Sequence, residues 1–179
     1  MKIHPMIAFF AGLAGCTSNT TERLRLAPLR TVAHVDLERY VGTWYEIASF
    51  PQRFQRGCTL TRATYAIRPD GDIDVLNSCR KDSPAGEEMS ARGRARVVDR
   101  FTNARLEVSF FRPFWGDYWI IDLADDYSYA VVGHPSRDYL WILSRSPSMT
   151  DTTWQGIVGR LQAQGYETSR LVRTLQVSS

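Results

Sequence analysis

Between residues 43 and 145, apolar and polar side chains alternate with a period of two, and turn-forming residues interrupt the alternation at short intervals. This pattern is typical of β-strands that have one buried face. Pro69, Asp70 and Gly71 mark one interruption, because proline fixes φ and glycine readily adopts a positive φ in a tight turn. The alternation predicts eight strands, over residues 43–50, 59–68, 72–79, 89–98, 104–111, 118–123, 129–133 and 139–145.

After Pro147 the spacing of apolar residues changes to that of a helix, with Trp154, Ile157, Val158 and Leu161 on one face. Capping residues precede this stretch at 148–151, and a glycine at position 165 follows it. Residues 36–40 are expected to form one helical turn before the first strand. Residues 170–175 are expected to form a last extended segment.

The connections between the predicted strands are short, so neighbouring strands are expected to pair as antiparallel hairpins in up-and-down order. The expected fold class is therefore all-β: an eight-stranded antiparallel up-and-down β-barrel with one C-terminal α-helix packed outside. Closure into a barrel removes the sheet edges that would otherwise aggregate. A barrel of eight strands is about wide enough to hold one small ligand.

The composition is that of a single folded domain. The chain has 179 residues, of which 44% are hydrophobic and 12% aromatic, and its formal net charge is +3. Positive and negative residues interleave along the chain, which excludes a nucleic-acid groove or a polybasic membrane patch as the main feature. No nucleic-acid partner is expected.

The N-terminal residues have the layout of a secretory leader. Residues 1–15 carry one charge, on Lys2, and then an apolar run that is too short to span a bilayer, which takes ~20 residues. The sequence Leu13-Ala14-Gly15-Cys16 resembles the bacterial lipobox, in which the cysteine becomes a lipidated N-terminus. That resemblance implies a lipid anchor on Cys16, and the residue after it, Thr17, implies the outer membrane of a Gram-negative bacterium. An ordinary leader with a chance cysteine is the alternative.

These features divide the chain into three parts. We expect a lipoprotein signal peptide over residues 1–15, a lipidated N-terminus and tether over residues 16–34, and a barrel domain over residues 35–177. The tether is expected because residues 17–33 are polar and then rich in arginine, with one proline.

Three short motifs occur in order along the predicted strands: Gly42-x-Trp44-Tyr45, Asp125-Asp126-Tyr127 and Arg145. They resemble the three signatures of the lipocalins. The longer strings over residues 108–114 and 139–145 are similar to the bacterial lipocalins, in the subgroup near apolipoprotein D. The resemblance covers residues 35–175.

The resemblance implies a structural role for three of the motif residues, Gly42, Trp44 and Arg145. In lipocalins the tryptophan closes the narrow end of the barrel and the late arginine lies across its indole ring. Such a cation–π contact is worth ~1–2 kcal/mol when it is partly desolvated. Asp125 and Asp126 could be mistaken for a catalytic carboxylate pair, but in a turn they are expected to cap backbone amides.

The ligand-binding residues are expected on the inner face of the barrel. Strand parity and the family's pattern place there Tyr65, Val75, Asn77, Leu106, Val108, Phe110, Tyr139 and Trp141. The same parity places Ala48 on the inner face with Trp44, whereas residues 118–121 are apolar on both faces and give no parity. Side chains near the closed end are expected to be ordinary core.

An apolar lining of this kind suits an acyl chain. Burial of each CH₂ contributes ~0.8 kcal/mol, and a bilayer buries both chains of a two-chain lipid whereas the pocket would bury one. The pocket therefore competes best with the bilayer for single-chain lipids. Lysophospholipids and fatty acids are therefore the expected partners, in agreement with the family. An arginine at position 56, 62 or 112 could meet a phosphate or carboxylate near the mouth, although the sequence does not place these side chains.

The remaining candidates for chemistry are few. Cys58 and Cys79 lie on paired strands in an oxidising compartment, so a disulfide is expected, although the count from the intervening turn requires an offset. His134 precedes a proline in a hairpin, where a histidine is usually solvated. No spacing predicts a zinc site or a nucleophile elbow, and no cofactor, metal or catalytic residue is expected. Two alternatives stay open: an enzyme acting on a hydrophobic substrate, and an envelope structural protein with a filled barrel.

Overall fold

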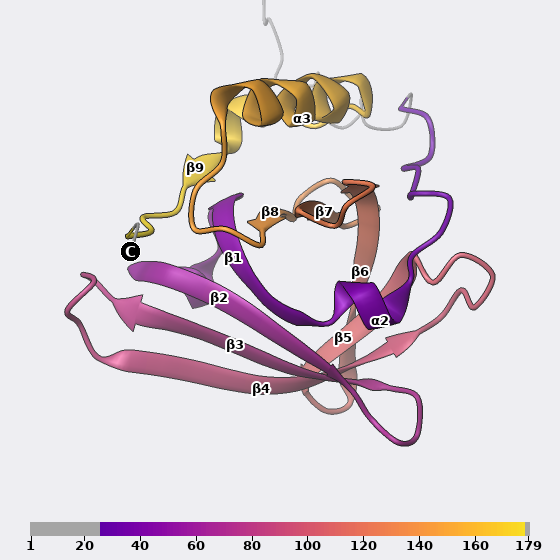
Figure 1. Ribbon diagram of the computed structural model, residues 1–179, viewed down its shortest axis with the longest axis horizontal. Helices are drawn as coiled ribbons and strands as arrows, with labels where there is room; N and C mark the ends of the chain where they lie inside the picture. Colours follow the sequence, from indigo (N-terminus) through magenta and orange to yellow (C-terminus); the bar gives the residue numbers. More distant parts are fainter. Residues whose placement is uncertain (1–25, 178–179) are drawn as a thin grey trace, which may run out of the picture.

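The computed structural model describes residues 26–177, which fold into a closed β-barrel with one long helix outside it (Figure 1). The expected signal peptide over residues 1–15 and the expected lipid anchor at Cys16 lie outside the described residues. Eight antiparallel strands follow one another around the barrel, and β2 also pairs with β1, which closes it. These strands are β1 (Gly42–Ser49), β2 (Cys58–Ile67), β3 (Ile73–Lys81), β4 (Glu88–Val97), β5 (Arg105–Phe111), β6 (Phe114–Leu123), β7 (Tyr129–Gly133) and β8 (Leu140–Ser144).

The expected fold class is confirmed, strand by strand and with the helix in place. The strand bounds differ from the predicted ones mainly at β6, which begins at Phe114 instead of residue 118. Phe111 pairs with Phe114, so the β5–β6 connection is a tight turn at Arg112 and Pro113. Gly116 lies inside β6, opposite Val108 of β5.

The helix α3 (Asp151–Ala163) lies against the outside of the barrel (Figure 1). Thr150 caps its first turn by accepting a hydrogen bond from the backbone N–H of Thr153, and Gly165 ends it with φ of +80°. A 3₁₀ turn, η2 (Thr168–Arg170), then leads to the short strand β9 (Val172–Arg173), which pairs with β1. A further 3₁₀ turn, η1 (Arg53–Gln55), lies between β1 and β2.

The apolar side chains form two clusters, one inside the barrel and one beneath α3. The inner cluster includes Trp44 and Leu106, and the outer one joins Ile157 and Leu161 of the helix to the outer faces of the strands. Ala48 belongs to the outer cluster, so its expected position on the inner face is wrong. The pairing of β1 with β8 shifts between Glu46 and Ala48, and this β-bulge reverses the alternation along the rest of the strand.

The part of the expected tether that the structure describes, residues 26–34, packs onto the domain. Leu29 is buried in the outer cluster, and the backbone N–H of Val32 donates to the carbonyl of Ile120 at 3.0 Å. The Arg137 side chain also donates to the carbonyl of Ala27 at 2.6 Å. The folded part of the chain therefore starts earlier than residue 35, because leucine and valine in this segment bury apolar surface against β6 and α3.

Arg145 joins the end of β8 to α2 (Leu37–Tyr40), the short helix that leads into β1. Its guanidinium carbon lies 3.7 Å from the centre of the Trp44 indole ring, as the resemblance implied. It donates four hydrogen bonds of 2.7–3.1 Å, to the carbonyls of Arg39, Tyr40, Val41 and Thr43. Gly42 lies beside it with φ of +95°, where a Cβ atom would come within 3.3 Å of the guanidinium.

The disulfide between Cys58 and Cys79 is confirmed, with the two Cα atoms 5.4 Å apart. The offset that the sequence required is also present. Cys58 pairs in register with Lys81, and the register shifts between Thr59 and Arg62. The bond joins β2 to β3 at the end of the hairpin farthest from its turn.

Candidate ligand-binding pocket

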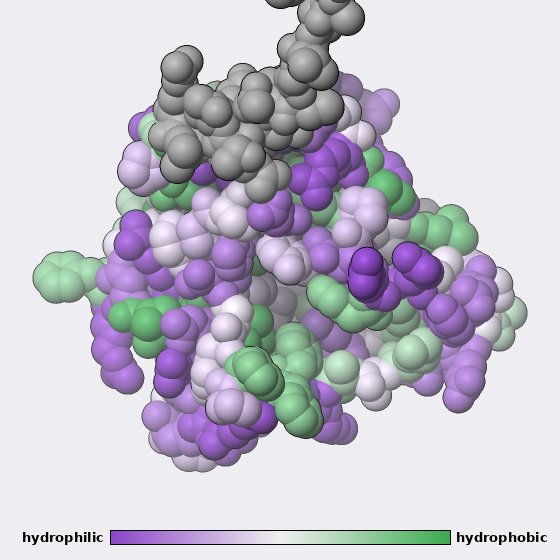
Figure 2. Space-filling view, turned by 180° about the vertical axis from the view of Figure 1, so that it is seen from behind, coloured by the Kyte–Doolittle hydropathy of each residue, from purple (hydrophilic) through white to green (hydrophobic). Residues whose placement is uncertain are grey.

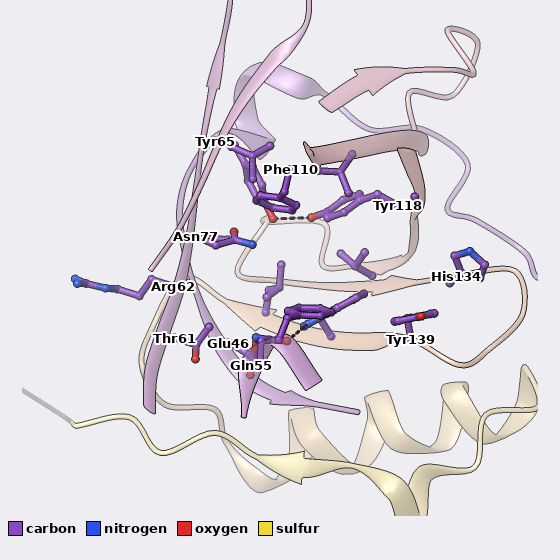
Figure 3. A pocket seen from close by; sticks show the side chains of 18 of the residues that line it. Glu46, Gln55, Thr61, Arg62, Tyr65, Asn77, Phe110, Tyr118, His134 and Tyr139 are labelled. Atoms are coloured by element: carbon purple, nitrogen blue, oxygen red, sulfur yellow. Dashed lines mark hydrogen bonds between the residues drawn. The ribbon is translucent and has the colours of Figure 1, made fainter. Parts of the chain in front are cut away.

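A cavity of about 370 Å³ lies inside the barrel, between the inner core at the closed end and the hairpin loops at the other end (Figure 3). This volume falls at the lower end of the range of small-molecule sites, about 300–1,000 Å³. Seven of the eight residues expected to bind ligand line it: Tyr65, Val75, Asn77, Val108, Phe110, Tyr139 and Trp141.

Leu106, the eighth, does not line the cavity. It is 2% exposed and packs in the inner cluster. Val108, two residues further along β5, is the first residue of that strand to reach the cavity. The alternation of β5 assigned Leu106 to the correct face, but alternation gives no information about depth along the barrel.

Three tyrosines form a hydrogen-bonded chain at the deep end of the cavity. The hydroxyl of Tyr118 lies 2.7 Å from that of Tyr40 and 3.0 Å from that of Tyr65. Tyr65 and Tyr118 line the cavity (Figure 3). Tyr40 does not line it and packs against Trp44, with the ring centres 5.3 Å apart. Burial raises the pKa of Tyr65 to about 12 and raises those of Tyr40 and Tyr118 well above the usual value, so all three phenols are neutral at pH 7.

The middle of the cavity is mainly apolar, and its polar member is Asn77, which pairs with Ala63 across β2 and β3. The apolar walls come from small and branched side chains on facing strands, namely Ala63, Val75, Val108, Val132 and Leu143. Such walls make no directional contacts, so they accept a hydrocarbon chain without selecting its chemical detail.

A buried carboxylate lies on the wall nearer the mouth. Glu46 is 5% exposed and lines the cavity. Its oxygens accept hydrogen bonds from Gln55 at 2.7 Å, Ser49 at 3.0 Å and Thr174 at 2.5 Å. The other end of the Gln55 amide accepts a hydrogen bond from the indole N–H of Trp141 at 3.0 Å. Among the described residues, no lysine, arginine or histidine forms an ion pair with Glu46.

The mouth of the cavity carries exposed aromatic side chains. Phe54 of η1 and Phe110 of β5 line it, and both are more than 40% exposed. Phe111 and Phe114 stack on each other at the tip of the β5–β6 hairpin. Elsewhere the surface is mixed: on the face in Figure 2, apolar patches are separated by polar side chains.

The arginines proposed for the mouth do not point into the cavity. Arg62 is one of the residues that line the cavity, but its side chain extends away from it (Figure 3). Arg112 lies in a separate shallow hollow on the outer surface, together with Arg94 and Trp115. Arg56 is exposed and offers its backbone carbonyl to Lys81.

His134, Ser136 and Asp117 resemble a catalytic triad at the edge of the cavity. The Ser136 hydroxyl is 2.9 Å from Nδ1 of His134, and Asp117 is 3.6 Å from Nε2. However, the backbone N–H of Ser136 donates to the same Nδ1 at 3.1 Å, so the lone pair that a general base requires is already used by the turn. The contacts are explained by a local side-chain turn between residues two apart.

Three further features complete the description of the site. Among residues 26–177, no group of three or more histidine, cysteine, aspartate or glutamate side chains is placed to hold a metal ion. In the turn before β7, Asp126 accepts a hydrogen bond from the backbone N–H of Ser128 at 2.9 Å, and its hydrogen bonds with Ser128 lower its pKa. Its position is that of a turn cap, as expected. Within the same range, no helix is long and apolar enough to cross a membrane.

The residues that sequence reasoning missed are Glu46 and the pair Tyr40 and Tyr118. Glu46 follows Trp44 by two residues, so the alternation of β1 already placed it inside the barrel. Tyr118 stands in the stretch with no readable parity, and Tyr40 precedes the first strand. No signal in the sequence brought these two hydroxyls together.

Comparisons with known proteins agree with this geometry. The model of the lipocalin-like domain family matches residues 35–176. The chain is 37% identical to the outer membrane lipoprotein Blc of Escherichia coli over the full length of both chains. It is 32% identical to apolipoprotein D of Mus musculus, covering 97% of this chain and 96% of that one. The structure also resembles that of insecticyanin from the tobacco hornworm Manduca sexta, with a TM-score of 0.68, 20% identity and coverage of 86% of this chain and 87% of that one. The chain belongs to the lipocalin family.

Proposed function

We propose that this lipocalin binds one single-chain lipid, a lysophospholipid or a fatty acid, and stores or carries it within the bacterial envelope. The observation that supports this proposal is the cavity of about 370 Å³ with apolar walls and a few polar groups. Lipocalins are typically binding proteins, and among residues 26–177 the pocket holds no arrangement of groups suited to turnover. We therefore assign binding and not catalysis to this site.

The size and lining of the cavity favour one acyl chain over two. Each buried CH₂ contributes ~0.8 kcal/mol, whether it enters the protein or a bilayer. A two-chain lipid would have to give up both chains' contacts in the bilayer while the cavity has room for one. A single-chain lipid gives up only one, and it leaves membranes readily, so it is the class for which this pocket competes well.

The charge of Glu46 predicts which single-chain lipids bind with the higher affinity. Its carboxylate lines the cavity near the mouth, and no cation of the described chain offsets it. A fatty-acid carboxylate placed beside it would meet like-charge repulsion, whereas a zwitterionic lysophospholipid brings an ammonium group to the same region. We therefore expect tighter binding of lysophospholipids than of fatty acids.

We further propose that Cys16 carries a lipid anchor that holds the domain at the outer membrane. The lipobox-like sequence before Cys16 supports this, as does the full-length similarity to proteins named outer membrane lipoprotein. Leu26, the first described residue, follows Cys16 by ten positions, and an extended chain over ten steps reaches at most ~35 Å. Mass spectrometry of the mature N-terminus tests the anchor, and a Cys16→Ser protein that still fractionates with the outer membrane contradicts it.

The binding function is tested by titrating delipidated protein with a lysophospholipid and a fatty acid, and by native mass spectrometry for copurified lipid. Ala63→Phe fills the apolar middle of the cavity and is expected to lower the affinity at least tenfold. Ala66→Phe adds the same ring to the same strand at an exposed position, so it serves as the matched control with unchanged affinity. Failure of the wild type to bind any single-chain lipid saturably would refute the proposal.

A further inference from the structure

The deep end of the cavity holds more hydrogen-bond donors than it can use internally. Tyr40, Tyr118 and Tyr65 carry three hydroxyl protons, and their chain contains only two hydroxyl-to-hydroxyl contacts. Among residues 26–177, no other hydrogen bond of these three hydroxyls occurs. Each contact uses one proton, so one O–H of the three always lacks an acceptor within the chain.

The position of the spare proton follows from the order of the chain. If both outer hydroxyls donate to Tyr118, the spare proton is that of Tyr118. If donation runs from Tyr40 through Tyr118 to Tyr65, the spare proton is that of Tyr65. Only the reverse direction leaves it on Tyr40. Two of the three arrangements therefore present the proton from a residue that lines the cavity, and an acceptor inside the cavity would select one of these two.

We propose that the pocket recognises single-chain lipids that carry a neutral oxygen acceptor, such as a ketone or a hydroxyl, at the end of the chain that lies deepest. The acceptor would receive the spare phenolic hydrogen bond from Tyr65 or Tyr118. A chain that ends in a plain methyl group covers this donor without satisfying it, and a covered, unpaired donor is costly.

The acceptor is expected to be neutral. Tyr65 is 7% exposed, Tyr40 is 2% exposed, and the cavity walls next to them are apolar. An ionised carboxylate at this depth would lose its hydration and find one or two phenols and no cation beside it. The guanidinium of Arg145 packs on Trp44 and is committed to the backbone carbonyls of Arg39 and Tyr40.

This inference rests on the proposed function, since it specifies the ligand of the same cavity. Its test compares two probes, a lysophospholipid with a plain acyl chain and the same lipid with a ketone on the penultimate carbon. Chain length is varied, and the comparison is made at the length that the wild type binds best. The measured quantity is the ratio of the dissociation constant of the keto lipid to that of the plain lipid.

We expect this ratio to be about tenfold higher in the double variant Tyr65→Phe and Tyr118→Phe than in the wild type. Tenfold corresponds to one net hydrogen bond of about 1.4 kcal/mol. The matched control is Tyr40→Phe. It also removes one buried hydroxyl, but it leaves Tyr118 and Tyr65 with two protons and one contact, so the spare proton stays in the cavity. Its ratio should equal that of the wild type.

Equal ratios in the wild type and the double variant, with the plain lipid bound by both, would overturn this inference and leave the proposed function intact. If neither lipid binds to the wild type, the proposed function itself fails. A second readout uses the wild type alone, with ¹³C at the ring carbon that bears the hydroxyl of tyrosine. The keto lipid should shift the signal of Tyr65 or Tyr118 relative to the plain lipid, and identical spectra with both lipids would also overturn the inference.

Discussion

Replacing Arg145 by alanine removes the contact that closes the narrow end of the barrel. The guanidinium covers one face of Trp44 at 3.7 Å and donates to four backbone carbonyls around the end of α2. Alanine cannot replace either interaction. The change therefore separates β8 from the entry to β1 without altering a residue that lines the cavity.

The size of the effect can be worked out from these contacts. A hydrogen bond to a charged group contributes about 1.5–3 kcal/mol, and the cation–π contact contributes ~1–2 kcal/mol. The four hydrogen bonds share one donor group that is partly exposed, and water can reach some of the freed carbonyls, so the values do not add. We expect a loss of about 3–5 kcal/mol in the free energy of unfolding, which corresponds to roughly 6–20 °C in Tm for a domain of this size.

The assay is thermal and urea unfolding followed by circular dichroism, on the variants Arg145→Ala, Arg145→Lys and Arg96→Ala. Lysine retains the charge but not the planar fork, so it should recover little of the loss. Arg96 is the matched control: it lies over Trp115 at 4.3 Å and pairs with Glu107, but on the exposed surface, so its removal should cost at most about 1 kcal/mol. If Arg145→Ala unfolds like the wild type, or like Arg96→Ala, the closed end does not depend on this arginine.

Three further predictions follow from the same structure. Replacing Cys58 and Cys79 by alanine, or reducing the bond, should lower the free energy of unfolding by about 3 kcal/mol in urea titrations, since the bond closes a loop with a sequence separation of 21; equal midpoints with and without reductant would contradict this. Glu46→Gln removes the negative charge near the mouth, so the affinity for a fatty acid should rise relative to that for a lysophospholipid, and an unchanged ratio in parallel titrations would show that the ligand does not meet this charge. At alkaline pH the buried tyrosines should oppose folding. Burial raises the pKa of Tyr65 from 10.0 in the unfolded chain to about 12 in the folded protein, so the unfolded chain loses this proton first as the pH rises. The free energy of unfolding should therefore be unaffected by this group below pH 10 and should fall between pH 10 and 12. A free energy of unfolding that stays constant over that interval would refute the assignment of a buried, neutral phenol.

Period-two alternation was enough to predict the eight strands, their order and the face that most of their side chains occupy. It failed where the backbone departs from a regular strand. The bulge after Glu46 moves Ala48 from the inner to the outer cluster, and no residue type in β1 announces it. The alternation also carries no information about depth along the barrel. For this reason Leu106 was predicted to line the pocket, although its side chain lies in the core beneath the pocket.

The polar contents of the pocket were harder to foresee than its apolar walls. A glutamate on the inner face contradicts the expectation that inward positions are apolar, and it is tolerated because Gln55, Ser49 and Thr174 all donate to it. One of these partners, Thr174 of the C-terminal segment, is 128 residues away in the chain, and Gln55 is brought back to Glu46 by the 3₁₀ turn η1. Such a network follows from how the barrel is closed and covered, and the local sequence does not encode it.

The cavity also bears on where the stabilising contacts lie. At about 24 cal/mol per Å³, protein side chains that leave a volume of about 370 Å³ unfilled give up at most roughly 9 kcal/mol of packing with one another. The contacts that offset this lie around the cavity: Arg145 and Trp44 at one end, the Cys58–Cys79 bond near the other, and α3 along one wall. A ligand that fills the space restores part of that packing only in the folded state, so it must stabilise the domain by RT ln(1 + [L]/Kd). At a hundredfold excess over Kd this amounts to about 2.7 kcal/mol, which is large enough to follow binding of a colourless lipid by the shift in Tm alone.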